Sequence, residues 1–195
     1  MKRLLITSFE PFGGDTLNAS AEAAGLVPEV IGGWSLVKRE LPVVFGLAGE
    51  RCLALVEALA PDAVLLLGQA AGRSAVTPEL AARNYRWARI PDNAGRSPRG
   101  EAVVPGGEDA LFATLPVGVM TAAIRGVGLP AALSCAAGYY VCNDLYYTVL
   151  HRLRGTPIRA GFVHVPGSAT LPAAEAARAV AAAIGALDEV SGRRL

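Results

Sequence analysis

The sequence predicts an α/β fold in which helices are layered on a mostly parallel sheet, and two observations support this. Short apolar runs of strand length alternate along the chain with longer segments of helical periodicity. The run AVLLL at Ala63–Leu67 has no polar alternation, as expected for a central strand covered on both faces. Because sites in such folds form at the carboxyl ends of the strands, we expect the functional residues there.

The expected elements alternate in chain order. The predicted strands are Arg3–Ser8, Ser35–Val44, Ala63–Leu67, Ala131–Cys135 and Arg159–Val165. The predicted helices are one capped by Asn18 or Ser20, then Gly46–Leu59, Val117–Val127, Tyr139–Leu153 and Ala173–Leu187. Glycines, prolines and arginines crowd the segment Gly68–Asp109, which predicts either a long functional insertion or an excursion of short strands.

Composition excludes several classes of protein. The chain has 195 residues, so we expect a single domain over 1–195. An apolar fraction of 52% with only 18% charged residues excludes a disordered chain. A net charge of +1 without a basic cluster argues against a nucleic-acid partner, and no apolar stretch is long enough to span a membrane. Three cysteines, an odd number, favour a reducing compartment and hence the cytoplasm.

The inventory of nucleophiles and bases is short. Cys52 and Cys135 fall inside a predicted helix and strand, where cysteine usually acts as a small buried apolar residue. His151 lies in the last turn of a predicted helix, where a cation complements the helix dipole. Cys142 opens a helix whose positive end lowers a thiol pKa, and His164 ends a strand at the expected site edge. These two residues are the candidates for nucleophilic catalysis.

Such a pair needs a third group that fixes the tautomer of the imidazole. The spacing leaves five acidic residues open for this role: Glu79, Asp92, Glu101, Glu108 and Asp109. The histidines and cysteines are not paired at the spacings of a closed zinc site. We therefore expect neither a metal nor another cofactor.

Six segments, in order, carry a resemblance to one family. They are Phe9–Gly14 with Asn18 and Ser20, Gly68–Arg73, Thr77–Glu79 with Asn84, Ala88–Asn93, Ala137–Asn143 and Phe162–Pro166. On these segments the chain resembles the pyroglutamyl peptidase I (pyrrolidone-carboxylate peptidase) family of cysteine peptidases. The resemblance implies a single three-layer α/β/α domain with a mixed, mostly parallel sheet. It also implies a homo-oligomer, either a tetramer or a dimer.

The resemblance further implies a role for particular residues. Cys142 is the nucleophile, His164 the general base and Glu79 the group that orients it. The substrate-binding positions are Phe9, Phe12, Ile90, Tyr140 and Val141, with Gln69 and Arg89 beside the reacting group. The implied activity is hydrolysis of the amide bond after an N-terminal pyroglutamyl (5-oxoproline) residue of a peptide, through a thioacyl-enzyme.

Two rival interpretations belong to other classes. A nucleoside-phosphorylase-like enzyme would need an anion pocket, for which Arg73, Arg83, Arg86 and Arg89 are available. A catalytically inactive binding module on the same scaffold is the second.

Overall fold

The computed structural model describes residues 1–188, and its centre is a six-stranded sheet. The strands, in the order in which they pair, are β2 (Val30–Ile31), β3 (Trp34–Leu41), β1 (Lys2–Phe9), β4 (Ala63–Gln69), β10 (Arg159–Val165) and β5 (Thr77–Glu79). The β3–β1, β1–β4 and β4–β10 pairs are parallel, whereas the two edge pairs, β2–β3 and β10–β5, are antiparallel. The predicted mixed, mostly parallel sheet is confirmed.

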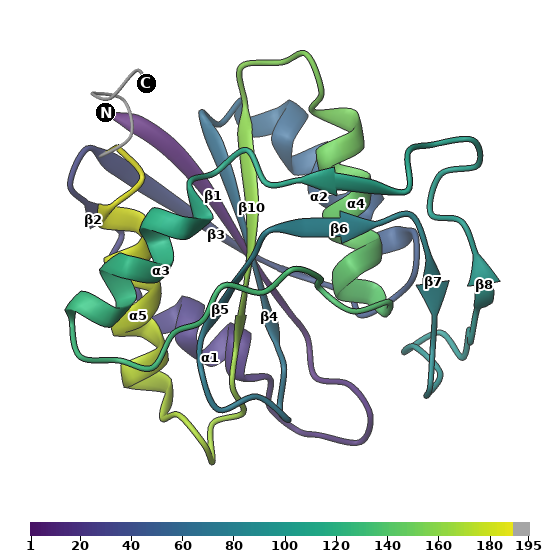
Figure 1. Ribbon diagram of the computed structural model, residues 1–195, viewed down its shortest axis with the longest axis horizontal. Helices are drawn as coiled ribbons and strands as arrows, with labels where there is room; N and C mark the ends of the chain where they lie inside the picture. Colours follow the sequence, from purple (N-terminus) through teal and green to yellow (C-terminus); the bar gives the residue numbers. More distant parts are fainter. Residues whose placement is uncertain (189–195) are drawn as a thin grey trace.

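Helices cover both faces of this sheet, as Figure 1 shows. The helices are α1 (Ala19–Leu26), α2 (Leu47–Leu59), α3 (Val117–Gly126), α4 (Val141–Arg152) and α5 (Ala173–Gly185). α1, α3 and α5 pack on one face, and α2 and α4 pack on the other. The three-layer α/β/α architecture expected from the resemblance is therefore confirmed.

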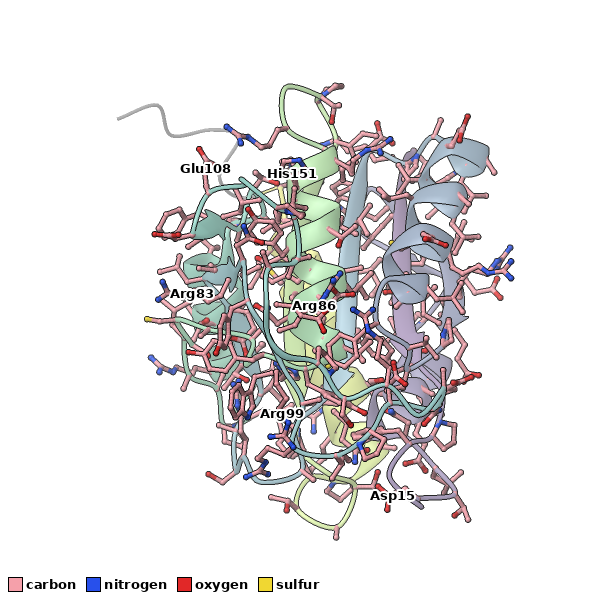
Figure 2. All side chains as sticks on the ribbon, turned by 90° about the vertical axis from the view of Figure 1, so that its right-hand side faces the viewer. Asp15, Arg83, Arg86, Arg99, Glu108 and His151 are labelled. Atoms are coloured by element: carbon pink, nitrogen blue, oxygen red, sulfur yellow. The ribbon has the colours of Figure 1, made fainter. Side chains whose placement is uncertain are left out.

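The segment after β4 is an excursion of short strands, which was one of its two predicted forms. It contains β6 (Ala81–Arg83), β7 (Arg86–Trp87), β8 (Arg99–Glu101) and β9 (Ala110–Phe112). β6 pairs with β9 and β7 with β8, both antiparallel. In Figure 2, Arg83 lies on the side of α4 away from α2, whereas Arg86 lies over α4, where it pairs with Asp144.

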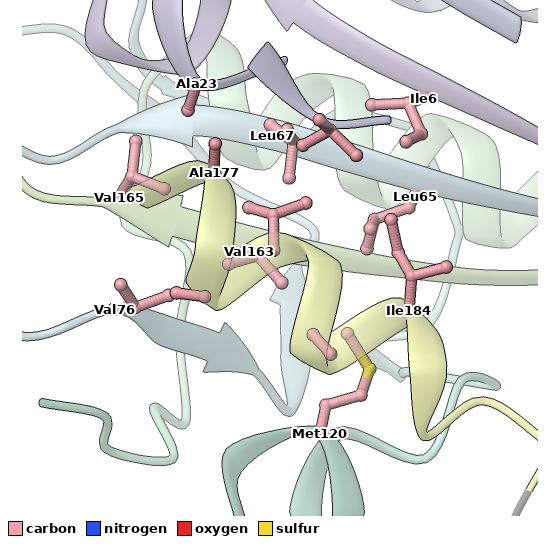
Figure 3. Close-up of a cluster of buried hydrophobic side chains, with 14 of the residues drawn as sticks. Ile6, Ala23, Leu65, Leu67, Val76, Met120, Val163, Val165, Ala177 and Ile184 are labelled. Atoms are coloured by element: carbon pink, nitrogen blue, oxygen red, sulfur yellow. The ribbon is translucent and has the colours of Figure 1, made fainter. Parts of the chain in front are cut away.

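Two apolar cores explain why the central strands lack polar alternation. Leu65 of β4 and Val163 of β10 face a core shared with α1, α3 and α5, where Met120 and Ile184 pack against the sheet (Figure 3). The intervening side chains of the same strands, such as Phe162, point into a second core under α2 and α4. A strand that faces helices on both sides has to be apolar at every position.

The predicted strand Ala131–Cys135 is wrong. This segment runs parallel to β5 but forms only two isolated bridges, from Val76 to Ala131 and from Glu79 to Ser134. Pro78 lies between them and has no N–H to donate, so the ladder is broken at its middle position. The backbone N–H of Ser134 still donates to the Pro78 carbonyl, at 3.0 Å.

Other boundaries differ from the predictions by a few residues. Asn18 is the N-cap of α1, with its side chain accepting from the backbone N–H of Ser20. β3 ends at Leu41 rather than Val44, and α4 begins at Val141, after an extended N-cap at Tyr140. The far end of the predicted domain, 189–195, lies outside the described residues. Within residues 1–188, no helix is both long enough and apolar enough to cross a membrane.

Candidate active site

The strands β4 and β10 bring His164 to the carboxyl edge of the sheet. His164 is paired in register with Gly68 of the parallel neighbour β4. Laterally paired residues of a sheet point to the same face, so His164 lies on the side of α2 and α4. Phe162, two residues earlier on the same face, lies with its ring centroid 4.6 Å from that of His164.

Helix α4 brings Cys142 to the same edge and the same face. Gly138, with φ of +80°, turns the chain into the extended residues that precede the helix, and Cys142 is its second residue. A Cβ built on Gly68 would lie 3.0 Å from Cys142 Sγ. The Cys142 thiol therefore lies over Gly68, the residue that is paired with His164. The thiol and the imidazole are thus both neighbours of this one residue of β4.

Among the five acidic candidates, Glu79 contacts the imidazole. Its side chain is fully buried, and its Oε1 accepts from His164 Nδ1 at 2.8 Å. The same oxygen accepts from a guanidinium N–H of Arg73 at 2.5 Å, whereas Oε2 has no hydrogen-bond partner. Asp92 instead accepts from the backbone N–H of Phe45. With Nδ1 donating to Glu79, the other ring nitrogen, Nε2, is the one free to accept a proton.

The charge states in this cluster differ from the sequence-based expectation. Burial and the negative charge of Glu79 raise the pKa of Cys142 to about 12, against the lowering effects of its own backbone N–H and of Arg73. Burial lowers the pKa of His164, although Glu79 raises it. The prediction that the helix end lowers the pKa of this thiol is therefore wrong for the unliganded site, because desolvation outweighs the helix dipole. The resting pair is a neutral thiol and a neutral imidazole.

Two buried polar residues that the sequence reasoning missed fix the first turn of α4. Asn143 donates to the backbone carbonyl of Arg83 and accepts from its N–H, both at 2.8 Å. Asp144 accepts from Arg86 Nε at 2.5 Å and from the backbone N–H of Gly46 at 2.7 Å. The signal in the sequence was a pair of polar residues on the buried side of a helix, directly after the candidate nucleophile.

A small cavity with about 10 Å³ of free space lies beside the thiol. Its lining consists of Phe9, Phe12, Asn18, Val43, Gln69, Tyr140, Val141 and Cys142. Five of these were expected substrate-binding positions, namely Phe9, Phe12, Gln69, Tyr140 and Val141. Asn18 was expected only as a helix cap, and Val43, which follows β3, carried no signal of its own. Gln69 Oε1 accepts from the backbone N–H of Ala19 at 2.7 Å, which fixes the orientation of its amide.

The other two expected positions, Arg89 and Ile90, lie elsewhere. They line a second, more open cleft together with Trp87 and Tyr139. Phe12 and Tyr140 border both hollows. Arg89 and Ile90 are therefore neighbours of the small cavity rather than part of its lining.

The remaining nucleophiles and bases lie outside this site. Cys52 is buried in α2 as predicted, and burial raises its pKa to about 12. Cys135 is exposed, so its prediction as a buried strand residue is wrong, in keeping with the broken ladder described above. His151 stacks on Tyr147, with ring centroids 6.1 Å apart. Among residues 1–188, no three His, Cys, Asp or Glu side chains are grouped so that they could hold a metal ion.

The mid-chain arginines do not converge on an anion site. Arg73 is paired with Glu79, and Arg86 with Asp144. Arg83 is exposed and lies apart from Arg86 (Figure 2). Arg89 faces the open cleft. This arrangement does not favour the phosphorylase-like alternative.

Comparison with known proteins agrees with this geometry. The family model described as pyroglutamyl peptidase matches residues 2–184. The chain belongs to the pyroglutamyl peptidase family. A pyrrolidone-carboxylate peptidase of Erwinia tasmaniensis is 47% identical over 85% of this chain and 78% of its own length. One of Thermococcus onnurineus is 46% identical over 84% of this chain and 83% of its own.

Solved structures of the pyroglutamyl peptidase family have the same fold. The crystal structure of pyroglutamyl peptidase I from Bacillus amyloliquefaciens superimposes with a TM-score of 0.92 at 34% identity, covering 97% of this chain and 98% of that one. Pyrrolidone carboxyl peptidase from Thermococcus litoralis gives the same TM-score and identity, covering 100% and 97%. The family resemblance found in the sequence is thus confirmed.

Proposed function

We propose that this chain is a cysteine exopeptidase that hydrolyses the amide bond after an N-terminal pyroglutamyl residue of peptides. Membership of the pyroglutamyl peptidase family supports the activity. One observation supports the roles of the residues: the His164 imidazole, which is bound to Glu79, and the Cys142 thiol both lie beside Gly68 of β4. The thiol also lines a small apolar cavity. Cys142 is the nucleophile, His164 the general base and Glu79 its orienting group. Residues 1–195 form one catalytic domain.

The reaction runs from a neutral pair. His164 Nε2 takes the thiol proton as Cys142 Sγ bonds to the carbonyl carbon, and the carbonyl oxygen becomes an oxyanion. The free backbone N–H groups at the start of α4 stabilise that oxyanion, and loss of one such donor costs about 3–4 kcal/mol of barrier. The imidazolium then gives its proton to the leaving amine as the C–N bond breaks. In the second half, His164 deprotonates a water that cleaves the thioester and returns the thiol.

The side chains that line the cavity suit a pyroglutamyl ring in their chemistry. The residues that line it include no charged side chain, which matches an N-terminus that has no ammonium group. Phe9 and Phe12 supply apolar walls, and the Gln69 amide, whose oxygen already accepts from the Ala19 N–H, directs its NH₂ group to the lactam carbonyl. The free space in the hollow is only about 10 Å³, so the lining side chains have to move apart when the ring binds.

The test is a comparison of two chromogenic amides, pyroglutamyl and prolyl, which differ in the lactam carbonyl and consequently in the charge on the ring nitrogen. We expect hydrolysis of the pyroglutamyl amide and a kcat/KM about 10⁴-fold lower for the prolyl amide, because the latter leaves buried polar groups unpaired. Cys142→Ser should abolish turnover, while Cys135→Ser, at an exposed cysteine, serves as the matched control. Tight binding without turnover in the wild type would indicate the inactive binding module, and phosphate-dependent cleavage would indicate the phosphorylase-like enzyme.

Two further proposals concern the protein's surroundings. We propose a homo-oligomer, a dimer or tetramer, because the resemblance to the family implies one. Sedimentation at working concentrations tests this. We also propose a cytoplasmic location, since free cysteines and a thiol nucleophile favour a reducing compartment. Cell fractionation tests that assignment.

A further inference from the structure

The open cleft beside the small cavity has the character of a binding site. It has a volume of about 330 Å³ and is lined by Phe12, Trp87, Arg89, Ile90, Tyr139 and Tyr140. Trp87, Ile90 and Tyr139 are each more than 40% exposed. Apolar side chains of this size gathered around one hollow indicate a surface that binds something.

The cleft is continuous with the site that we assign to the pyroglutamyl ring. Phe12 and Tyr140 line both hollows, and their ring centroids are 6.0 Å apart. Tyr140 is also the N-cap of α4, two residues before Cys142. A peptide whose first ring fills the small cavity, with its scissile carbonyl at Cys142, therefore has this cleft as the adjoining apolar surface for its next residue.

The walls of the cleft are held in place before any ligand arrives. The backbone N–H of Trp87 donates to the Tyr139 carbonyl at 2.8 Å, and Tyr140 Oη donates to the Pro91 carbonyl at 2.9 Å. Arg99 lies over the Trp87 ring at 5.1 Å, and Tyr85 packs edge-on against Tyr139 with centroids 5.3 Å apart. A rigid cleft binds without the cost of ordering its own side chains.

We propose that this cleft binds the residue that follows the pyroglutamyl group and selects aromatic and large apolar side chains there. Trp87, Ile90 and Tyr139 supply the apolar contact. Arg89 is the one charged side chain of the lining, so a lysine or arginine in the substrate is disfavoured. This inference rests on the proposed function, since it assigns the second subsite of the same reaction.

The experiment measures kcat/KM for pyroglutamyl-X-amides in which X is Phe, Met, Ala or Lys. We expect Phe and Met to exceed Ala by about 10-fold or more. We expect Lys to fall well below Met, which has a similar length without the charge, and this gap should narrow as salt is raised. Values within about twofold across the series would overturn the proposal.

Variants separate the cleft from other apolar surface. Trp87→Ala and Tyr139→Ala should each reduce the Phe-to-Ala ratio of kcat/KM by about 10-fold. Phe112→Ala removes an even more exposed aromatic from β9, outside the cleft, and should leave both the ratio and the activity unchanged. An equal change in all three variants would contradict the assignment. If the wild type hydrolyses none of the amides, the proposed function itself fails; if it hydrolyses all of them equally, only the cleft proposal fails.

Discussion

The position of Gly68 makes the reactive geometry sensitive to a single methyl group. In Gly68→Ala the new Cβ would lie 2.7 Å from Phe162 Cζ and 3.0 Å from Cys142 Sγ. Ordinary contacts between carbon atoms are about 3.5–4.0 Å. The neighbouring side chains therefore have to move by about 1 Å, and one of them carries the proposed nucleophile.

The two consequences of this overlap differ in size. Overpacking of a buried site costs about 1–3 kcal/mol of unfolding free energy, which lowers the Tm of a domain of this length by about 2–4 °C per kcal/mol. A displacement of about 1 Å at the reacting atoms reduces the rate by about 10²-fold. Gly68→Ala should thus remain folded at 25 °C while losing most of its kcat for a pyroglutamyl amide.

Gly49→Ala is the matched control. Its Cβ would lie 2.8 Å from Thr148 Cγ2, an equally tight overlap, but between α2 and α4 and nearly two turns beyond Cys142. Part of that strain is offset by a gain in helix propensity of up to about 1 kcal/mol. Thermal melts and steady-state kinetics are measured on both variants. The reasoning is refuted if Gly68→Ala keeps wild-type kcat, or if Gly49→Ala loses as much activity as Gly68→Ala does.

Three other predictions concern the groups around His164. Glu79→Gln removes the charge that orients the imidazole, so stopped assays should show kcat lowered, by up to about 10⁴-fold, with little change in KM; an unaltered kcat would remove Glu79 from the triad. Arg73→Met leaves the charge of Glu79 uncompensated, which raises the pKa of His164, so the acid limb of the kcat/KM profile should move to higher pH. A loss of stability with an unmoved limb would make Arg73 merely structural. Burial lowers the pKa of His164 below its ordinary value of 6.5. The contribution of this residue to the free energy of unfolding is therefore fully present above pH 6.5 and is lost as the pH falls below that value. Urea titrations should accordingly show a shallower acid-side loss of stability in His164→Gln, and identical slopes would exclude His164 as the source.

Hydrophobic periodicity was sufficient for the layered fold because the central strands have apolar residues at every position. Ala63–Leu67 could be placed from its sequence alone, since covering helices demand such a run. Ala131–Cys135 has a similar local texture, yet its ladder depends on Pro78, more than fifty residues earlier in the chain. Whether two segments pair depends on both of them, so it cannot be predicted from the sequence of one segment alone.

The candidate site, too, has features that the local sequence predicts and features that it does not. Cys142 and His164 were recognisable because each side chain sits at the end of an element, which is a local property. The choice of Glu79 required the family resemblance, since five acids were equally placed by spacing. The protonation state was wrong because helix position is visible in a sequence, whereas burial beneath neighbouring strands and the approach of a carboxylate are not.

The neutral thiol at rest also bears on how the protein withstands oxidation. Peroxides and alkylating agents react with the anion of a cysteine, so their reaction with Cys142 requires His164 to take the thiol proton. Cys135, by contrast, stands in open solvent on an irregular segment. Modification of Cys142 therefore uses the same proton transfer as turnover, whereas modification of Cys135 takes place at the surface without help from that base.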